Sequence, residues 1–170
     1  IVQAVSEKID LVVFSEMFLT GYPPEDLLLR EDFLSKSEKL ALELEELSKE
    51  ISVIIGCPVR EDGYIFNSAL FFQKGKLIEK YKKQILPNYK EFDEKRYFKR
   101  GESHKVFEDK GFKFGISICE DIWDKDFAKE LFGRDIDLLL NLSASPYTID
   151  KKNLREKMLC EYFAEFKKPI

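Results

Sequence analysis

Three consecutive strand-like runs in the middle of the chain constrain its fold more than any other feature. Two short polar turns that contain glycine, Glu-Asp-Gly and Lys-Gly-Lys, separate the runs at residues 52–59, 64–73 and 76–83. Such connections between apolar runs are typical of β-hairpins, because tight hairpin turns need residues with positive φ. The sequence therefore predicts three neighbouring antiparallel strands in one sheet.

Further strand-like and helical segments lie on both sides of these hairpins. Short apolar runs predict strands at 11–14, 105–109, 112–118 and 136–142. Apolar residues at three- and four-residue spacing predict amphipathic helices at 1–9, 31–49, 119–132 and 150–166. Hairpins and βα units occur together, so the class is α/β or α+β, with helices packed on mixed sheets. Both ends cut across expected elements, and we therefore expect a fragment.

Charge and hydropathy exclude several kinds of protein. The net charge is −4, and acidic and basic residues are interspersed, so the chain has no basic surface for nucleic acid or an anionic membrane. No apolar run approaches the roughly 18 residues of a membrane-spanning helix, and the first residues lack the apolar core of a signal peptide. We expect a cytoplasmic protein that acts on small molecules or protein partners, with no nucleic acid and no membrane.

The three cysteines show neither CxxC spacing nor a histidine cluster, which argues against a disulfide framework and a structural zinc site. At least one of them is a free thiol. We expect Cys57 and Cys160 to be small packed side chains.

Polar residues stand where three of the predicted strands end. Glu16 follows the run at 11–14, Lys83 ends the run at 76–83, and Cys119 follows the run at 112–118. In sheets covered by helices, ligand crevices form at the carboxyl ends of strands. The three side chains are therefore candidates for one site.

Lys83 has an ordinary structural explanation, because it belongs to a basic run typical of a solvated strand edge. The alternation of a β-strand separates the lysines, however. It places Tyr81 and Lys83 on one face and Lys80 and Lys82 on the other, so Lys83 can point inward while its neighbours stay in water.

Cys119 is the candidate nucleophile. A thiol at a strand-to-helix junction meets the positive end of the helix dipole, which predicts a lowered pKa and more thiolate. A cysteine in an apolar strand is, however, more often a small core residue. A nucleophilic cysteine also needs a base, and a partly buried carboxylate at Glu16 suits that role. His104, in a polar loop without a neighbouring motif, is the weaker alternative.

Four longer blocks carry a resemblance to a known family. FSEMFLTGYPPEDLLLR, KYKKQILPNYKEFDEKRYF, FGISICEDIW and NLSASPY, in this order, closely resemble the nitrilase superfamily of carbon–nitrogen hydrolases. Within it, they are most similar to the glutaminase domain of glutamine-dependent NAD synthetases. The resemblance implies a four-layer αββα sandwich with mixed sheets, in which residues 1–170 form one carbon–nitrogen hydrolase (glutaminase) domain, incomplete at both ends.

The same resemblance implies site residues. A Glu-Lys-Cys triad falls on Glu16, Lys83 and Cys119, and a second, supporting glutamate falls on Glu94. The residues that relatives use to hold glutamine fall on Tyr89, Glu120, Trp123 and Ser145, with Tyr22 as a further pocket candidate. Where relatives can offer an arginine to the substrate carboxylate, this chain has Lys151, which lacks the bidentate guanidinium.

The implied activity is hydrolysis of the glutamine side-chain amide, through a cysteine thioester, to glutamate and ammonia. A downstream ATP-dependent synthetase domain would use the ammonia to convert nicotinic acid adenine dinucleotide to NAD. That domain carries a Ser-Gly-Gly pyrophosphate loop, and no such loop occurs in these residues. ATP and Mg are therefore expected in the parent protein only, with no cofactor and no metal in this domain. The expected partners are glutamine and the synthetase domain, and we expect a homo-oligomer.

Two alternatives remain. One is a free-standing amidase or nitrilase that acts on another amide or nitrile. The other is a non-enzymatic scaffold built on the same sandwich, in which the Cys119 thiol would behave as an ordinary thiol with a pKa near about 8.5.

Overall fold

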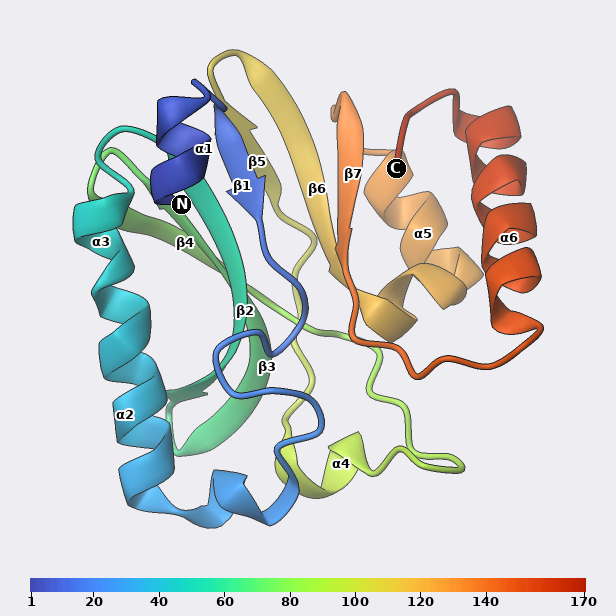
Figure 1. Cartoon of the computed structure of the whole chain (residues 1–170). Coiled ribbons are helices and arrows are strands. Elements are labelled where there is room, and N and C mark those ends of the chain that lie inside the picture. The colour runs from blue at the N-terminus through green and yellow to red at the C-terminus, as the bar shows by residue number, and fades with distance from the viewer.

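The computed structural model describes residues 1–170 and contains two β-sheets, with helices on the two outer sides (Figure 1). The strands are β1 (Leu11–Val13), β2 (Ser52–Glu61), β3 (Tyr64–Gln73), β4 (Lys76–Lys82), β5 (Val106–Asp109), β6 (Phe112–Ile118) and β7 (Leu138–Leu142). The α-helices are α1 (Val2–Ser6), α2 (Glu31–Leu42), α3 (Leu44–Leu47), α4 (Glu94–Tyr97), α5 (Lys125–Phe132) and α6 (Lys151–Phe166). Two 3-10 helices complete the chain, η1 (Glu25–Leu29) and η2 (Cys119–Trp123).

The first sheet has the order β1-β2-β3-β4. β1 runs parallel to β2, and β2, β3 and β4 are successive antiparallel neighbours, as the hairpin turns predict. Positive φ at Asp62-Gly63 and at Lys74-Gly75 closes the two turns. The second sheet has the order β5-β6-β7, with β5 antiparallel and β7 parallel to β6. Both sheets are therefore mixed.

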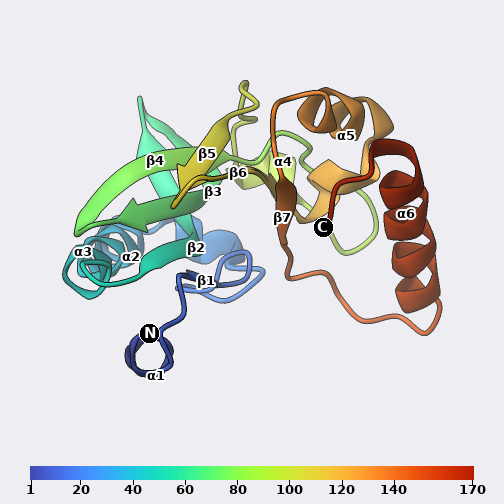
Figure 2. The same ribbon diagram turned by 90° about the horizontal axis from the view of Figure 1, so that it is seen from above.

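The two sheets pack face to face around aromatic side chains. A cluster of 18 buried residues joins them and continues under α5. In its middle, the ring of Phe71 in β3 lies 6.0 Å from Phe107 and 5.5 Å from Phe114 in the second sheet. A second cluster of nine buried residues lies on β2 and β3 and includes Ala41 and Leu44 of α2 and α3. Viewed from above, α2 and α3 flank one sheet while α5 and α6 flank the other, which gives four layers (Figure 2).

Several element boundaries differ from the sequence predictions. The predicted helix 31–49 is divided at Glu43, and its buried face is narrower than expected, because Leu40 is half exposed. The predicted stripe at 1–9 is also partly wrong, since Val2 is 76% exposed. The helix predicted to begin at Cys119 starts as η2 and continues as α5 after Asp124, whose side chain accepts the N–H of Phe127 at 2.9 Å.

Two of the cysteines differ in burial. Cys57 is buried in β2, but Cys160 is exposed on α6, so the expectation of a packed side chain is wrong for Cys160. No helix combines the length and the apolar character needed to cross a lipid bilayer.

Gly56 brings the segment after β1 against β2. A Cβ atom at Gly56 would lie 2.4 Å from the backbone oxygen of Ser15 and 2.7 Å from the Cα of Glu16. Real Cβ atoms do not approach so closely, so only glycine allows the chain to cross here. This crossing sets the position of Glu16.

Candidate active site

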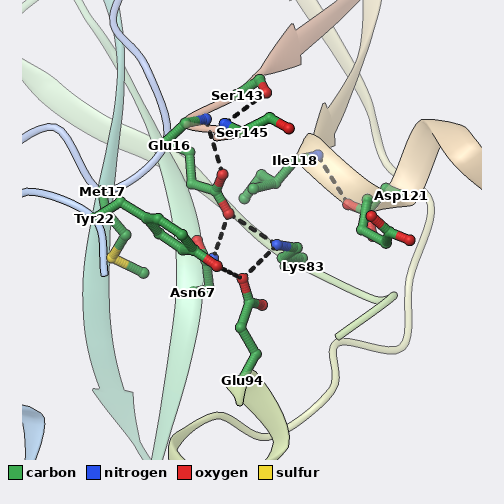
Figure 3. A network of polar contacts seen from close by, with 12 residues as sticks. Glu16, Met17, Tyr22, Asn67, Lys83, Glu94, Ile118, Asp121, Ser143 and Ser145 are labelled. Atoms are coloured by element: carbon green, nitrogen blue, oxygen red, sulfur yellow. Dashed lines mark hydrogen bonds and ion pairs between the residues drawn. The ribbon is translucent and has the colours of Figure 1, made fainter. Parts of the chain in front are cut away.

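Glu16, Lys83 and Glu94 meet in a buried cluster at the ends of β1 and β4 and the start of α4 (Figure 3). The Nζ atom of Lys83 lies 2.8 Å from Oε1 of Glu16 and 2.7 Å from Oε1 of Glu94. The side chains of Lys83 and Glu16 are fully buried, and that of Glu94 is 4% exposed. One ammonium group is therefore shared between two carboxylates out of contact with water.

Both carboxylate oxygens of Glu16 are held in place. Oε1 accepts the side-chain amide of Asn67 at 2.8 Å as well as Lys83, and Oε2 accepts the backbone N–H of Ala144 at 3.0 Å. Three different segments of the chain thus orient this carboxylate, so it is fixed before any ligand binds.

The alternation predicted for β4 is confirmed. Tyr81 and Lys83 are buried, whereas Lys80 and Lys82 stay partly exposed and pair with Glu61. Lys83 follows the last residue of β4 directly, and its backbone N–H still donates to a carbonyl of β3. The sheet therefore fixes the backbone that carries the central ammonium.

Opposing effects set the protonation of the cluster. Burial acts to lower the pKa of Lys83, but the charges of Glu16 and Glu94 together raise it above the usual value. Burial raises the pKa of Glu94; Lys83 opposes this rise, and Glu16 adds to it. The single positive charge of Lys83 therefore compensates only in part for the burial of Glu94.

Cys119 lies beside this cluster, at the first residue of η2. Its φ is +47°, in the left-handed region, and the side chain is 5% exposed. Burial raises the pKa of the Cys119 thiol to about 12, and Glu16 adds to the rise, while Lys83 and a hydrogen bond with Ser143 act in the opposite direction. The predicted lowering by a helix dipole is wrong, because burial beside a carboxylate outweighs the dipole of a five-residue 3-10 helix.

The raised pKa of the Cys119 thiol should determine how the rate of its alkylation depends on pH. We expect the rate at which iodoacetamide modifies Cys119 to increase about tenfold per pH unit between pH 7 and pH 10 without levelling off, because only the thiolate reacts. Mass spectrometry of the Cys119 peptide, in a Cys160→Ser background that removes the exposed thiol, measures this rate. Cys57, whose pKa burial also raises to about 12, is the internal control. A plateau between pH 8 and 9 would contradict this prediction.

The predicted substrate-binding residues divide into groups. The hydroxyl of Tyr22 donates to Oε1 of Glu94 at 2.9 Å, so Tyr22 belongs to the buried cluster. The hydroxyl of Tyr89 donates to Oε1 of Glu120 at 2.8 Å, and this pair is largely exposed. Glu120 directly follows Cys119, so the pair lies next to the candidate nucleophile.

Ser145 and Trp123 come from two further segments, the loop after β7 and the end of η2. Ser145 follows Ala144, which contacts Glu16, and its hydroxyl is buried without a hydrogen-bond partner. Trp123 lines a cavity of about 250 Å³ together with Ser143. Tyr22 and Glu94 line a separate cavity of about 230 Å³. The ammonium of Lys151 lies 5.7 Å from the centre of the Phe92 ring.

Two buried residues of the site were missed by the sequence analysis. Asn67 orients Glu16, and Asp121 accepts four hydrogen bonds near Cys119. Asn67 could have been noticed as a polar residue inside the apolar run of β3. Asp121 stands three residues after Ile118, the spacing at which a carboxylate reaches back to a backbone N–H at a helix start.

His104 takes no part in this cluster. Its Nδ1 lies 3.0 Å from Glu130 and its ring packs on Phe127 of α5. No group of three or more histidine, cysteine, aspartate or glutamate residues is arranged to hold a metal ion. The arrangement around Cys119 instead offers a thiol, a fixed carboxylate and an ammonium, which are the parts needed for covalent attack on a carbonyl carbon.

The chain is similar to known proteins in both sequence and structure. Residues 1–158 match the family described as carbon–nitrogen hydrolase. The chain is similar to the glutamine-dependent NAD(+) synthetase of Acinetobacter baylyi, with 41% identity over 160 residues that cover 94% of this chain and 29% of that protein. The solved glutamine-dependent NAD+ synthetase of Acinetobacter baumannii superposes with a TM-score of 0.90 and 41% identity, covering 96% of this chain and 31% of the other.

A more distant structure has the same architecture. An amidase of the nitrilase superfamily from Nesterenkonia superposes with a TM-score of 0.81 at 18% identity, over 96% of this chain and 62% of the amidase. At this identity the likeness shows the fold alone, and it confirms the nitrilase-like sandwich implied by the sequence motifs. The chain spans less than a third of the length of the two synthetases.

Proposed function

Because the chain belongs to the carbon–nitrogen hydrolase family, we propose that it hydrolyses the side-chain amide of glutamine to glutamate and ammonia. The observation that carries the proposal is the buried ammonium of Lys83, shared between Glu16 and Glu94 beside the Cys119 thiol. The names of the similar synthetases, which are glutamine-dependent, support glutamine as the substrate.

In the first half of the reaction, the sulfur of Cys119 attacks the amide carbon while Glu16 takes the thiol proton. A thiol that is neutral at pH 7 needs such a base, and Glu16 is fixed by three hydrogen-bonding neighbours. Lys83 stabilises the oxygen that becomes negative, a contribution of roughly 3–4 kcal/mol for one preorganised donor. The C–N bond then breaks, Glu16 returns the proton to the leaving nitrogen, and ammonia departs from a glutamyl thioester.

In the second half, water hydrolyses the thioester. Glu16 removes a proton from the water, whose oxygen attacks the same carbonyl carbon, and Lys83 again stabilises the negative oxygen. The C–S bond breaks, the proton returns to the sulfur, and glutamate leaves. One carboxylate therefore serves both halves, and Glu94 keeps Lys83 in position throughout.

We assign substrate recognition to the residues around this centre. Glu120, held by Tyr89, offers a carboxylate to the α-ammonium group of glutamine. The unpartnered buried hydroxyl of Ser145 and the ring of Trp123 are assigned to the substrate pocket, together with Tyr22, whose hydroxyl donates to Glu94. Lys151 offers at most a single positive charge to the α-carboxylate.

We further propose that this chain is the ammonia-producing part of an NAD-forming protein. The ammonia would pass to an ATP-dependent synthetase domain, and ATP and magnesium are assigned to that domain rather than to any residue of this chain. A cytoplasmic location and a homo-oligomeric state stay predictions from the sequence.

Substrate preference tests the proposal. We expect the full-length protein to release equimolar ammonia and glutamate from glutamine, with a kcat/KM roughly 100-fold or more above that for butyramide, which lacks both α-substituents. Coupled assays for ammonia and glutamate measure both products, and heat-denatured protein is the blank. Equal rates on butyramide or butyronitrile would favour a general amidase or nitrilase, and no turnover of any of them would favour a non-enzymatic scaffold.

A further inference from the structure

Asp121 joins the two segments that carry Cys119 and Lys83. Its Oδ1 accepts the backbone N–H groups of Gln84 at 3.0 Å and Ile85 at 2.7 Å, directly after Lys83. Its Oδ2 accepts the backbone N–H of Ile118 at 2.8 Å, directly before Cys119, and the Tyr81 hydroxyl at 2.8 Å. The side chain is completely buried. One carboxylate therefore connects β4 and the residues after it with β6 and η2. Figure 3 shows its contact with Ile118.

The chemistry of these four contacts suits a carboxylate. Three partners are backbone N–H donors and the fourth is a hydroxyl that can donate, so an ionised aspartate, which only accepts, satisfies all four contacts. Burial raises the pKa of Asp121 to about 6, and the hydrogen bonds from Ile85, Ile118 and Tyr81 act in the opposite direction. The group is therefore mostly ionised at pH 7.5. An asparagine would turn an NH₂ group toward one pair of these donors.

The position of Asp121 matters because it gives the two segments a buried connection next to Lys83 and Cys119, whereas the hydrogen bond from Tyr89 to Glu120 joins them at the surface. The backbone at Cys119 is in the left-handed region, where a non-glycine residue needs its surroundings to hold it. The bond from Ile118 to Asp121 closes this turn, and the bonds from Gln84 and Ile85 tie the Lys83 segment to the same side chain.

We propose that Asp121 is a positioning residue, which fixes the separation of the Cys119 thiol and the Lys83 ammonium so that both act on one carbonyl group. It touches neither the substrate nor the reacting atoms. The inference rests on the proposed glutaminase function where it is tested by kcat. A second measurement, the rate of Cys119 alkylation, needs no glutamine.

Asp121→Asn in the full-length protein tests the proposal. We expect kcat for glutamine hydrolysis, per folded molecule, to fall roughly 100-fold, because displacement of a reacting group by about 1 Å has an effect of this size. KM should stay within about twofold of the wild-type value. The thermal unfolding curve supplies the folded fraction at the assay temperature. A purely structural role would lower the folded fraction and leave kcat per folded molecule unchanged.

Asp124→Asn is the matched control. Asp124 lies three residues further along and accepts one backbone N–H at the start of α5, without any contact to the Lys83 segment. Because asparagine caps a helix about as well as aspartate, the replacement is expected to leave the melting midpoint nearly unchanged and kcat per folded molecule within about twofold of the wild type. An equal loss of kcat in both variants would overturn the proposal.

Alkylation of Cys119 supplies the readout that is independent of glutamine. Lys83 lowers the pKa of the Cys119 thiol, so an ammonium that has moved away leaves less thiolate. We expect iodoacetamide at pH 9 to modify Cys119 about tenfold more slowly in Asp121→Asn, which corresponds to one pKa unit. An unchanged or faster rate would overturn the proposal, even if glutamine proves not to be the substrate.

Tyr81→Phe is a milder variant that tests the same proposal if Asp121→Asn does not fold. This variant removes one of the four donors and leaves the carboxylate and its three backbone contacts in place. We expect kcat and the alkylation rate to fall several-fold in the same direction. Wild-type values for both would overturn the proposal.

Discussion

Replacing Cys119 by alanine is expected to reduce ammonia release from glutamine on the order of 10⁶-fold, to the background of the assay, because no other group can form the thioester. The remaining cluster of Glu16, Lys83 and Glu94 is untouched by the change. Glutamine should therefore still bind, and isothermal titration calorimetry of the variant should measure a dissociation constant equal to the wild-type KM or larger, because a thioester that accumulates lowers KM. Steady-state assays and titration together separate chemistry from binding.

Cys57→Ala is the matched control for this variant. Both thiols are buried, but Cys57 lies in the cluster between β2 and the outer helices, away from Lys83. Each replacement should lower the free energy of unfolding by about 1 kcal/mol, for the loss of one small buried group. Only Cys119→Ala should lose activity. Substantial residual turnover in Cys119→Ala would rule out the proposed nucleophile.

Replacing Lys83 by methionine is expected both to abolish hydrolysis and to lower the free energy of unfolding by about 3–5 kcal/mol at pH 7.5. Methionine fills a similar space but leaves two buried carboxylates without a cation. The loss of oxyanion stabilisation alone reduces kcat by about 10²- to 10³-fold, and displacement of Glu16 adds to this. Urea unfolding and steady-state assays measure the two effects.

The stability difference should depend on pH. The pKa of Lys83 is raised in the native protein, so its contribution is complete below about pH 10.4 and is lost as the pH rises through the raised value. In the variant, Glu94 loses its cation, and its already raised pKa rises further. The variant therefore becomes less stable as the pH rises above about 4.3, the usual value for glutamate. The difference from the wild type should be smaller at pH 5 than at pH 7.5.

Lys82→Met controls for the removal of a neighbouring lysine. Lys82 points to the other face of β4 and pairs with the partly exposed Glu61 at 2.5 Å. Exposed pairs contribute about 0–1 kcal/mol, so this variant should keep its stability within that range and retain its activity. If Lys82→Met and Lys83→Met were equally damaging, the buried cluster could not explain either result.

The hairpin strands and their antiparallel pairing could be predicted because they depend on local signals, whereas the parallel pairs β1–β2 and β6–β7 join segments distant in the sequence. The turns at Asp62-Gly63 and Lys74-Gly75 specify two hairpins by themselves, and alternation along β4 separates Lys82 from Lys83 without further information. The break of the helix at Glu43 and the exposure of Val2 could not be predicted in this way. Apolar spacing indicates that a helix can form, but neighbouring segments decide which apolar residues they cover.

Site residues could be predicted where a polar residue stands out against an apolar sequence. Glu16, Lys83 and Cys119 stand out because polar groups follow apolar strands, and the family resemblance adds Glu94. Asn67 was missed because its partner lies 51 residues away in the sequence. The direction of the pKa shift at Cys119 was predicted wrongly, because the burial of the thiol and its nearness to Glu16 follow only from the packing of the two sheets.

The sharing of one ammonium between two carboxylates also affects release of the proposed product, glutamate. The cluster contains two carboxyl groups and only one ammonium group, and burial prevents water from screening negative charge there. A glutamine amide is neutral and meets no repulsion there, whereas the same end of glutamate is an anion. In the proposed reaction, hydrolysis would therefore convert a group that the pocket accepts into one that it repels, and the two carboxylates would favour product release.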